Sequence, residues 1–183
     1  MMDSDGVAGA VCSLPGRGVS ARSAVNHGPF ATTANERLLI LKRYRRIAMV
    51  GLSSDPYRPS HFAALYLLAK GYDVIPVNPG ADEIVGRPSY PSLADVPGSV
   101  EVVDIFRAPT AVPGIVDEAL AIGAQVIWMQ LGVVHEQAAQ TARQAGLEVV
   151  MDRCMKIEHA RFFGGLATLG LTTGIISARR MGA

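Results

Sequence analysis

The feature that most constrains the fold is a regular alternation of short apolar runs with amphipathic segments about ten residues long. Residues 47–52 form a continuous apolar run that ends in turn residues, as expected of a buried parallel strand. Residues 60–70 then show helical spacing and stop at Gly71. The predicted strands are 47–52, 74–77, 100–106, 125–131 and 147–151, and the predicted helices are 35–46, 60–70, 110–122 and 135–145. This alternation predicts right-handed βαβ units and a parallel sheet.

The pattern also assigns individual side chains. Thr110 is predicted to cap the helix that follows it, and only a short helix near Leu93 fits between the prolines of 86–97. Pro76 fits poorly in a central strand, because proline has no N–H to give to a neighbour. The apolar face expected for helix 60–70 consists of Phe62, Leu65, Tyr66 and Ala69.

The two ends of the chain differ in composition from its body. Residues 1–33 are rich in Gly, Ala and Ser, and Asp3 and Asp5 lie where a signal peptide carries basic residues. We predict a disordered leader there, or an over-extended start, followed by one folded domain over 34–163. Residues 164–183 form an apolar extension that should pack on its own sheet or on a second subunit, which leaves a homodimer open.

Composition excludes several classes of function. The 183 residues carry 17 Lys and Arg against 16 Asp and Glu, so a net charge of +1 gives no field that steers the chain to nucleic acid. We interpret the basic residues of 37–46 as a solvated helix face. No apolar stretch approaches membrane-span length, and two distant cysteines, Cys12 and Cys154, point to the reducing cytoplasm. No histidine has a partner at metal-ligand spacing, so each is expected to be a cap or a surface residue.

Polar or glycine-bearing residues follow every predicted strand, whereas the strand interiors read as apolar, and ligands of open α/β sheets bind at those strand ends. The first loop has one glycine, Gly51, instead of the three of a dinucleotide fingerprint. Ser53 and Ser54 can face a pyrophosphate, and Arg58 adds positive charge beside a helix N-terminus. An ordinary surface loop explains these residues equally well.

The end of the second strand separates nucleotide classes. An NAD site needs a carboxylate there for the ribose hydroxyl, but Asp73 precedes the strand and Asn78 follows it. An amide does not repel a phosphate, which suits a nucleotide whose ribose is phosphorylated. Coenzyme A and NADP are both ligands of this kind.

These strand ends resemble the small bacterial CoA-binding proteins, which are similar to the nucleotide-binding N-terminal domain of the succinyl-CoA synthetase α subunit. The resemblance rests on 47–53, 58–60, 71–79, 103–107, 128–133 and 151–154, and it spans about 35–162. It implies an α/β, Rossmann-like, doubly wound sheet of about five parallel strands with flanking helices. It also implies binding of coenzyme A or an acyl-CoA. The ligase chemistry is not expected, because the phosphorylated histidine of the synthetase lies in a separate domain.

The resemblance also implies roles for individual positions. Gly51, Ser53 and Ser54 would hold the phosphates, while Asn78 and Pro79 would line the nucleotide. A bulky residue at Gly51 should abolish binding and leave the fold largely intact. Phe106 and Arg107 would border the adenine or pantetheine path, and Gln130 and Gly132 would lie near pantetheine. Arg58 is added on electrostatic grounds alone.

Two enzymatic alternatives remain. An NADP-dependent oxidoreductase would share the fold, although the glycine triplet and a catalytic residue pair are missing. A CoA-linked redox or acyl-transfer enzyme would use Cys154, at the end of the last strand. Arg153 and Lys156 beside it favour a thiolate. Such a thiolate can attack the disulfide of oxidised CoA, which releases one CoA thiolate and retains the other CoA as a mixed disulfide. The competing interpretation is a buried, inert thiol.

Overall fold

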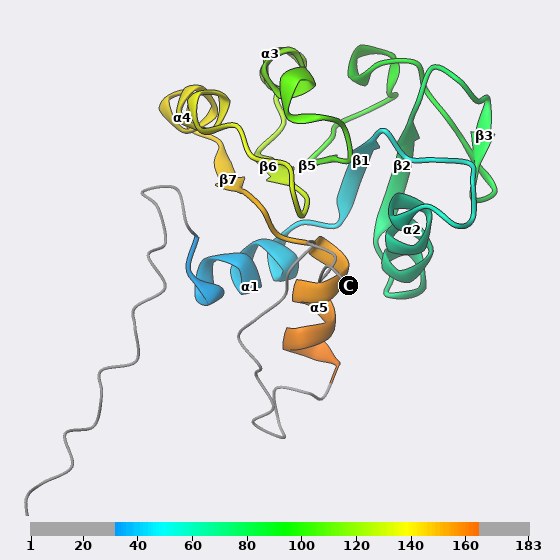
Figure 1. The fold of residues 1–183 in the computed structure, drawn as a ribbon, viewed down its shortest axis with the longest axis horizontal. Helices are drawn as coiled ribbons and strands as arrows, with labels where there is room; N and C mark the ends of the chain where they lie inside the picture. Colours follow the sequence, from blue (N-terminus) through cyan, green and yellow to red (C-terminus); the bar gives the residue numbers. More distant parts are fainter. Residues whose placement is uncertain (1–31, 165–183) are drawn as a thin grey trace, which may run out of the picture.

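The structure, a computed structural model, describes residues 32–164, which fold around one parallel sheet (Figure 1). Five strands lie in the order β2-β1-β5-β6-β7, and each pairs in parallel with its neighbours. They are β1 (Arg46–Val50), β2 (Asp73–Val77), β5 (Val102–Ile105), β6 (Val126–Met129) and β7 (Glu148–Val150). All five predicted strands are confirmed, with ends shifted by one or two residues. The prediction of a Rossmann-like α/β architecture is therefore confirmed.

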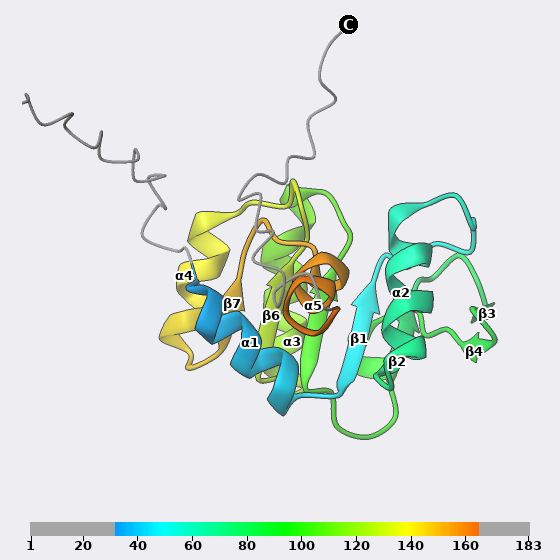
Figure 2. The same ribbon diagram turned by 90° about the horizontal axis from the view of Figure 1, so that it is seen from below.

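Helices cover both faces of the sheet (Figures 1 and 2). The helices are α1 (Ala34–Arg43), α2 (Pro59–Ala69), α3 (Val112–Ala121), α4 (Glu136–Gln144) and α5 (Met155–Phe163). Alternate strand residues point to opposite faces, so Ala48 and Ile127 pack with α3 and α4, whereas Met49 and Trp128 pack with α1, α2 and α5. The sheet is thus buried on both sides, which explains the continuous apolar runs.

The strand order fixes where a ligand can bind. β1 lies between β2 and β5, and the chain leaves β1 for one edge of the sheet and β5 for the other. Such a reversal is a topological switch point, and it opens a crevice beyond the carboxyl ends of the two strands. Gly51 follows β1 and Phe106 follows β5, so these two loops form the crevice.

The predicted apolar face of α2 is wrong. The helix packs on the sheet through Ser60, Ala63, Ala64 and Leu67. Phe62 and Leu65 are instead 52% and 47% exposed. The physical reason is size, because the small side chains let the helix approach the sheet closely, and α2 is apolar on both sides.

Other local predictions have mixed outcomes. Thr110 lies inside a 3₁₀ turn, Pro109–Ala111, and the cap of α3 is Ala111. The short helix near Leu93 is confirmed as the 3₁₀ turn Leu93–Asp95. Helix α5 was not predicted, nor was the small antiparallel pair of β3 (Glu83–Ile84) and β4 (Arg87–Pro88).

The described fold starts one residue before α1. Thr33 forms a capping box with Glu36, in which the Thr33 hydroxyl accepts from the Glu36 N–H at 3.2 Å. Thr33 thus belongs to the folded part, although the predicted leader ran to it. Residues 1–31 of the predicted leader, with Cys12, and the extension from residue 165 lie outside the described residues.

A buried ion pair ties α1 to α5. The Arg37 Nε donates to Glu158 Oε2 at 2.8 Å, and their side chains are only 8% and 2% exposed. Arg161 adds a second hydrogen bond to Glu158 at 3.0 Å. Arg37 is therefore an exception to the solvated basic face expected for 37–46.

Replacing Glu158 by glutamine is expected to lower the free energy of unfolding by about 3 kcal/mol, because it leaves the buried Arg37 cation without a counter-charge. Urea denaturation followed by circular dichroism measures the change. Glu148→Gln is the matched control, since its partner Arg43 is 63% exposed and the surface pair should contribute far less to stability. Equal losses in the two variants would contradict a special role for the buried pair.

Candidate functional site

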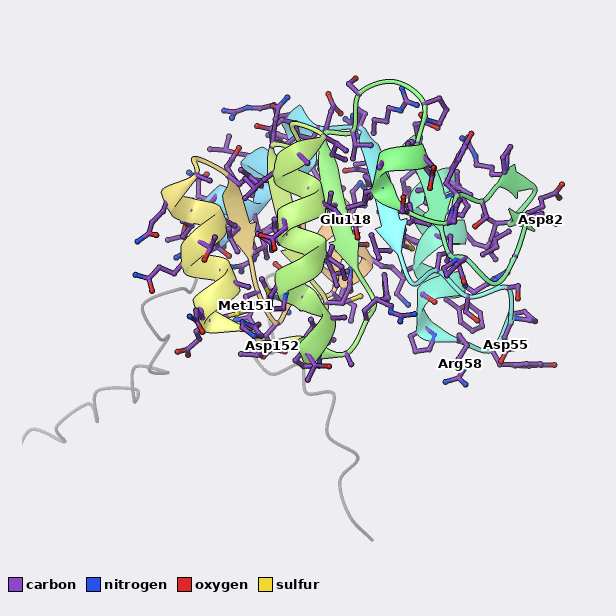
Figure 3. The ribbon with its side chains drawn as sticks, turned by 90° about the horizontal axis from the view of Figure 1, so that it is seen from above. Asp55, Arg58, Asp82, Glu118, Met151 and Asp152 are labelled. Carbon is purple, nitrogen blue, oxygen red and sulfur yellow. The ribbon has the colours of Figure 1, made fainter. Side chains whose placement is uncertain are left out.

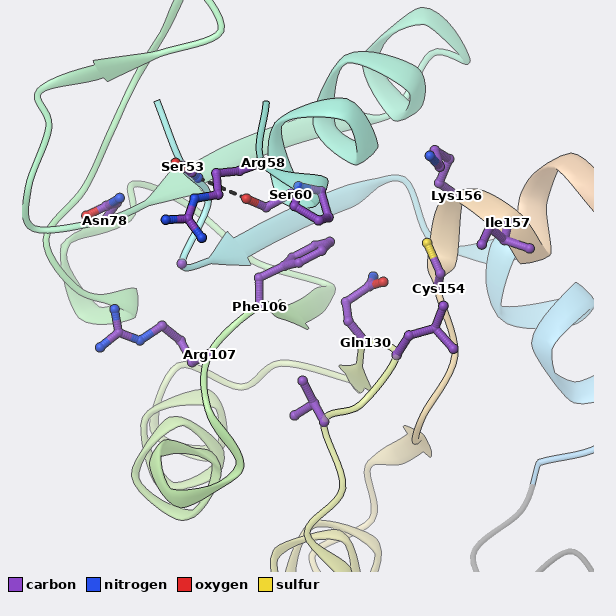
Figure 4. A pocket seen from close by; sticks show the side chains of 14 residues that line it. Ser53, Arg58, Ser60, Asn78, Phe106, Arg107, Gln130, Cys154, Lys156 and Ile157 are labelled. Carbon is purple, nitrogen blue, oxygen red and sulfur yellow. Dashed lines mark hydrogen bonds between the residues drawn. The ribbon is translucent and has the colours of Figure 1, made fainter. Parts of the chain in front are cut away.

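A pocket of about 740 Å³ opens at the carboxyl ends of the strands, over the switch point between β1 and β5 (Figure 4). Residues that follow all five strands contribute to it. The lining consists of Gly51, Ser53, Arg58, Pro59, Ser60, Asn78, Phe106, Arg107, Gln130, Leu131, Val133, Cys154, Lys156 and Ile157. The fold therefore collects chemically active side chains that are up to about a hundred positions apart in the sequence.

Most of the predicted site residues meet in this pocket. Those that line it are Gly51, Ser53, Arg58, Asn78, Phe106, Arg107 and Gln130. Ser54, Pro79 and Gly132 are exposed and do not belong to the lining. Gly132 instead donates its N–H to Asp152 Oδ1 at 2.8 Å, which ties the turn after β6 to the end of β7.

Two helix starts contribute to the pocket, of which sequence reasoning expected that of α2, near Ser60, and missed that of α5. Pro59 and Ser60 come from the first turn of α2, and Lys156 and Ile157 come from the first turn of α5. Both helices direct their N-terminal ends, which carry partial positive charge, at the pocket. The signal for α2 was visible in Pro59, a residue favoured in a first turn, whereas α5 had no comparable signal.

The pocket has a basic end. Arg58 and Arg107 lie with Ser53 and Asn78 on one side in Figure 4, and Cys154, Lys156 and Ile157 lie on the other, with Phe106 and Gln130 between them. The Arg58 side chain is 70% exposed, and its Nε lies 3.6 Å from Asp55 Oδ2. Both residues are labelled in Figure 3. This loose surface pair leaves the guanidinium available to an anionic ligand.

Hydrogen bonds hold the loops of the basic end in shape. The Asn78 amide donates to the Leu52 carbonyl and accepts from the Gly80 N–H, both at 2.8 Å. The Ser53 N–H donates to the Ser60 hydroxyl at 3.1 Å. Asn78 thus joins the loop after β1 to the loop after β2, a role that the sequence did not reveal.

Gly51 is confined by its backbone and its neighbours. Its φ is +85°, and a Cβ there would lie 3.0 Å from the Phe106 carbonyl oxygen and 2.7 Å from Arg107 Cδ. A larger residue therefore strains the end of β5 itself. This geometry argues against the expectation that a bulky substitution leaves the fold largely intact.

One strand interior is not apolar, contrary to prediction. Asp104 in β5 is fully buried, and its Oδ1 accepts a hydrogen bond of 2.6 Å from Gln130 Nε2. Burial raises the pKa of Asp104 to about 7, although the hydrogen bond from Gln130 opposes the shift. A titratable carboxyl thus lies directly behind a pocket residue.

Cys154 lines the pocket, but its environment does not favour a thiolate. Burial raises the pKa of the Cys154 thiol, the Asp104 charge raises it further, and backbone N–H groups of α5 and Lys156 only partly oppose this. Arg153 is directed elsewhere, since its guanidinium donates to the Asp152 carbonyl. The predicted activation by Arg153 and Lys156 is therefore outweighed by burial.

The three histidines within residues 32–164 have structural roles. His135 caps α4, as predicted, by accepting from the Ala138 N–H at 3.1 Å, and His61 Nδ1 lies 3.0 Å from the Ser53 carbonyl oxygen. His159 is buried beside Tyr66, which corrects its prediction as a cap or surface residue. Within 32–164, no cluster of His, Cys, Asp and Glu could hold a metal ion, and no helix could span a membrane.

A parallel sheet with a pocket at its switch point defines a doubly wound α/β ligand-binding protein. Residues 45–160 match the model of the CoA binding domain, so the chain belongs to that family.

Individual proteins are also similar to this chain. The uncharacterized protein YneT of Bacillus subtilis is 42% identical over 66% of this chain and 90% of its own length. A hypothetical protein of Pyrococcus horikoshii is 41% identical, with a TM-score of 0.71 over 74% of this chain and 95% of its own. The apo dinucleotide-forming acetyl-coenzyme A synthetase of Ca. Korarchaeum cryptofilum is 28% identical, with a TM-score of 0.53 over 58% of this chain and 26% of its own.

Proposed function

We propose that the pocket binds coenzyme A or an acyl-CoA, with the nucleotide at its basic end and the pantetheine arm directed past Phe106 and Gln130 toward Cys154. The observation that carries the proposal is the distribution of charge along the pocket, together with the family assignment. Arg58, Arg107 and the start of α2 suit phosphates. The half-buried Phe106 and Ile157 suit the less polar arm.

Binding alone explains the arrangement without chemistry. Cys154, the one nucleophilic thiol of the lining, has a raised pKa. The end of β2 presents Asn78, an amide, where an NAD site needs a carboxylate. Asn78 and the raised pKa of Cys154 favour a CoA-binding role over an NAD-dependent or a thiol-dependent enzyme. The single glycine of the first loop, Gly51, counts against the NADP-dependent alternative.

We expect calorimetric titration to give measurable affinity for CoA and about tenfold weaker affinity for dephospho-CoA, which lacks the 3′-phosphate that the basic end would hold. NAD and NADP, titrated under the same buffer conditions, should bind at least about a hundredfold more weakly than CoA. Dephospho-CoA is the matched ligand, since it differs from CoA by one phosphate. Equal affinity for NAD and CoA, or no heat with CoA and acetyl-CoA, would sink the proposal.

A further inference from the structure

Asp104 lies beneath the pocket in an apolar part of the sheet. It is fully buried in β5, next to Met49 of β1 and Trp128 of β6 in the strand register. An ionised carboxylate in such surroundings is costly unless hydrogen bonds compensate it. Only Oδ1 has a partner, while Oδ2 is buried with no hydrogen-bond partner among residues 32–164. The residue thus has no evident role in stabilising the fold.

The one partner of Asp104 is a residue of the pocket. Gln130 lines the pocket, is only 3% exposed, and gives its Nε2 to Asp104 Oδ1. The oxygen and nitrogen of an amide diverge from the same carbon. The hydrogen bond from Gln130 Nε2 to Asp104 therefore turns Gln130 Oε1 away from Asp104. Figure 4 shows Gln130 between Phe106 and Cys154, in the middle of the pocket. The carboxyl therefore controls which end of the amide a ligand meets.

Protonation of Asp104 would reverse the orientation of the Gln130 amide. Ionised Asp104 can only accept, so Gln130 must donate to it and present its oxygen to the ligand. Protonated Asp104 has a hydroxyl to donate, and Gln130 Oε1 is the acceptor that matches it. The amide then rotates and presents N–H groups to the ligand. At the position of Gln130, the pocket then offers the ligand a hydrogen-bond donor in place of an acceptor.

We propose that Asp104 is a positioning residue that orients the Gln130 amide, so that Gln130 Oε1 accepts a hydrogen bond from an amide N–H of the pantetheine arm. This inference rests on the CoA-binding role proposed above. The pantetheine arm carries secondary amides, whose N–H groups need an acceptor when they leave water. Gln130 lies on the path between the basic end and Cys154, where that arm would run.

Few other charges act on Asp104. Helix α5 supplies the Cys154 thiol, which interacts electrostatically with Asp104, and the Lys156 ammonium, which interacts with Cys154. The register neighbours Met49 and Trp128 do not titrate, and the buried face of α2 carries only serine, alanine and leucine. The buried arginine of α1 is already paired with α5. Two histidines also lie on these helices, since His61 of α2 contacts the Ser53 carbonyl oxygen and His159 of α5 contacts Tyr66. The Asp104→Asn variant separates the titration of Asp104 from theirs.

The test compares ligands with and without the arm. CoA and adenosine 3′,5′-bisphosphate are titrated calorimetrically from about pH 8 to about pH 6, across the pKa of about 7. The bisphosphate corrects for titration of the phosphates. Acidification should weaken CoA about tenfold more than the bisphosphate, because the binding-competent fraction falls about tenfold one unit below the pKa. The side chain of Asn is isosteric with Asp and does not titrate. In Asp104→Asn, acidification should therefore weaken CoA and the bisphosphate equally, so that the excess loss of CoA affinity disappears.

Gln130→Met supplies the second variant. Asp104 acts through Gln130, so this substitution should also remove the excess pH dependence, and adding Asp104→Asn should change CoA affinity less than about twofold further. The same excess in wild type and Asp104→Asn, or an affinity that rises on acidification, overturns the inference alone. Absence of binding by both CoA and the bisphosphate at every pH overturns the CoA-binding role as well.

Discussion

Replacing Gly51 by alanine is expected to weaken CoA binding about a hundredfold and to lower the free energy of unfolding by about 2–3 kcal/mol. Two effects add. The backbone at φ +85° is strained for any residue with a Cβ, and that atom would lie 3.0 Å from the Phe106 carbonyl oxygen. The end of β5 must then move, and the pyrophosphate loses the close approach of the loop backbone. Calorimetry with CoA and thermal denaturation measure the two losses.

Gly71→Ala is the matched control for this prediction. Gly71 has a nearly identical φ of +82°, but a Cβ there would meet nothing within 4 Å. Gly71 ends α2 and does not line the pocket. It should lose about 1 kcal/mol of stability through strain and keep its CoA affinity within about twofold. If both variants bound CoA equally well, the strand-end pocket would not be the binding site.

Asp104→Asn is expected to stabilise the protein at about pH 8 by up to about 4 kcal/mol, less the cost of the buried Asn N–H group that would have no partner at the position of Oδ2. The pKa of Asp104 is about 7 in the folded protein against 3.8 as its ordinary value, so the folded state holds a proton that the unfolded chain releases. The free energy of unfolding should therefore fall as the pH rises from about 4 to about 7 and stay level above that. Each unit of difference in pKa corresponds to about 1.4 kcal/mol.

Urea denaturation at several pH values tests this linkage. The wild-type curve should decline across the window, and the Asp104→Asn curve should be flatter by the contribution of this one group. Coincident slopes for the two proteins would show that Asp104 is already ionised in the folded state near pH 5. If Asp104→Asn is more stable than the wild type and also binds CoA differently, Asp104 lowers the stability of the protein but contributes to ligand binding.

Strands were easier to predict than helix faces. Apolar runs such as 47–52 stand out because a parallel sheet covered on both faces needs them. Helix α5 gave no such signal, because its buried residues include Glu158 and His159, whose polarity suggests exposure. For α2, the hydrophobic pattern favours a face of large side chains, but the smaller residues of the opposite face fit against the sheet. Tertiary packing decided both cases.

The candidate site was predictable to the extent that it follows topology. Strand ends of a parallel sheet meet at one edge, so Asn78, Arg107 and Gln130 could be grouped without coordinates. The link from Gln130 to Asp104 could not, because it depends on which face of the sheet Asp104 of β5 and Gln130, just after β6, each occupy. The only visible signal was an acid inside an apolar run at 102–106.

The two borders of the sheet have a consequence for how copies of this chain can meet. Along β2, Pro76 has no N–H to offer, and its carbonyl accepts from the Tyr90 N–H at 3.0 Å. Along β7, only three residues long, the Arg143 guanidinium donates to the Val149 carbonyl at 3.2 Å. Both borders of the described sheet are thus partly blocked to an incoming strand, which disfavours edge-to-edge association. Among residues 32–164, the side of α2 that carries Phe62 and Leu65 is an exposed apolar surface on which a second copy could pack instead.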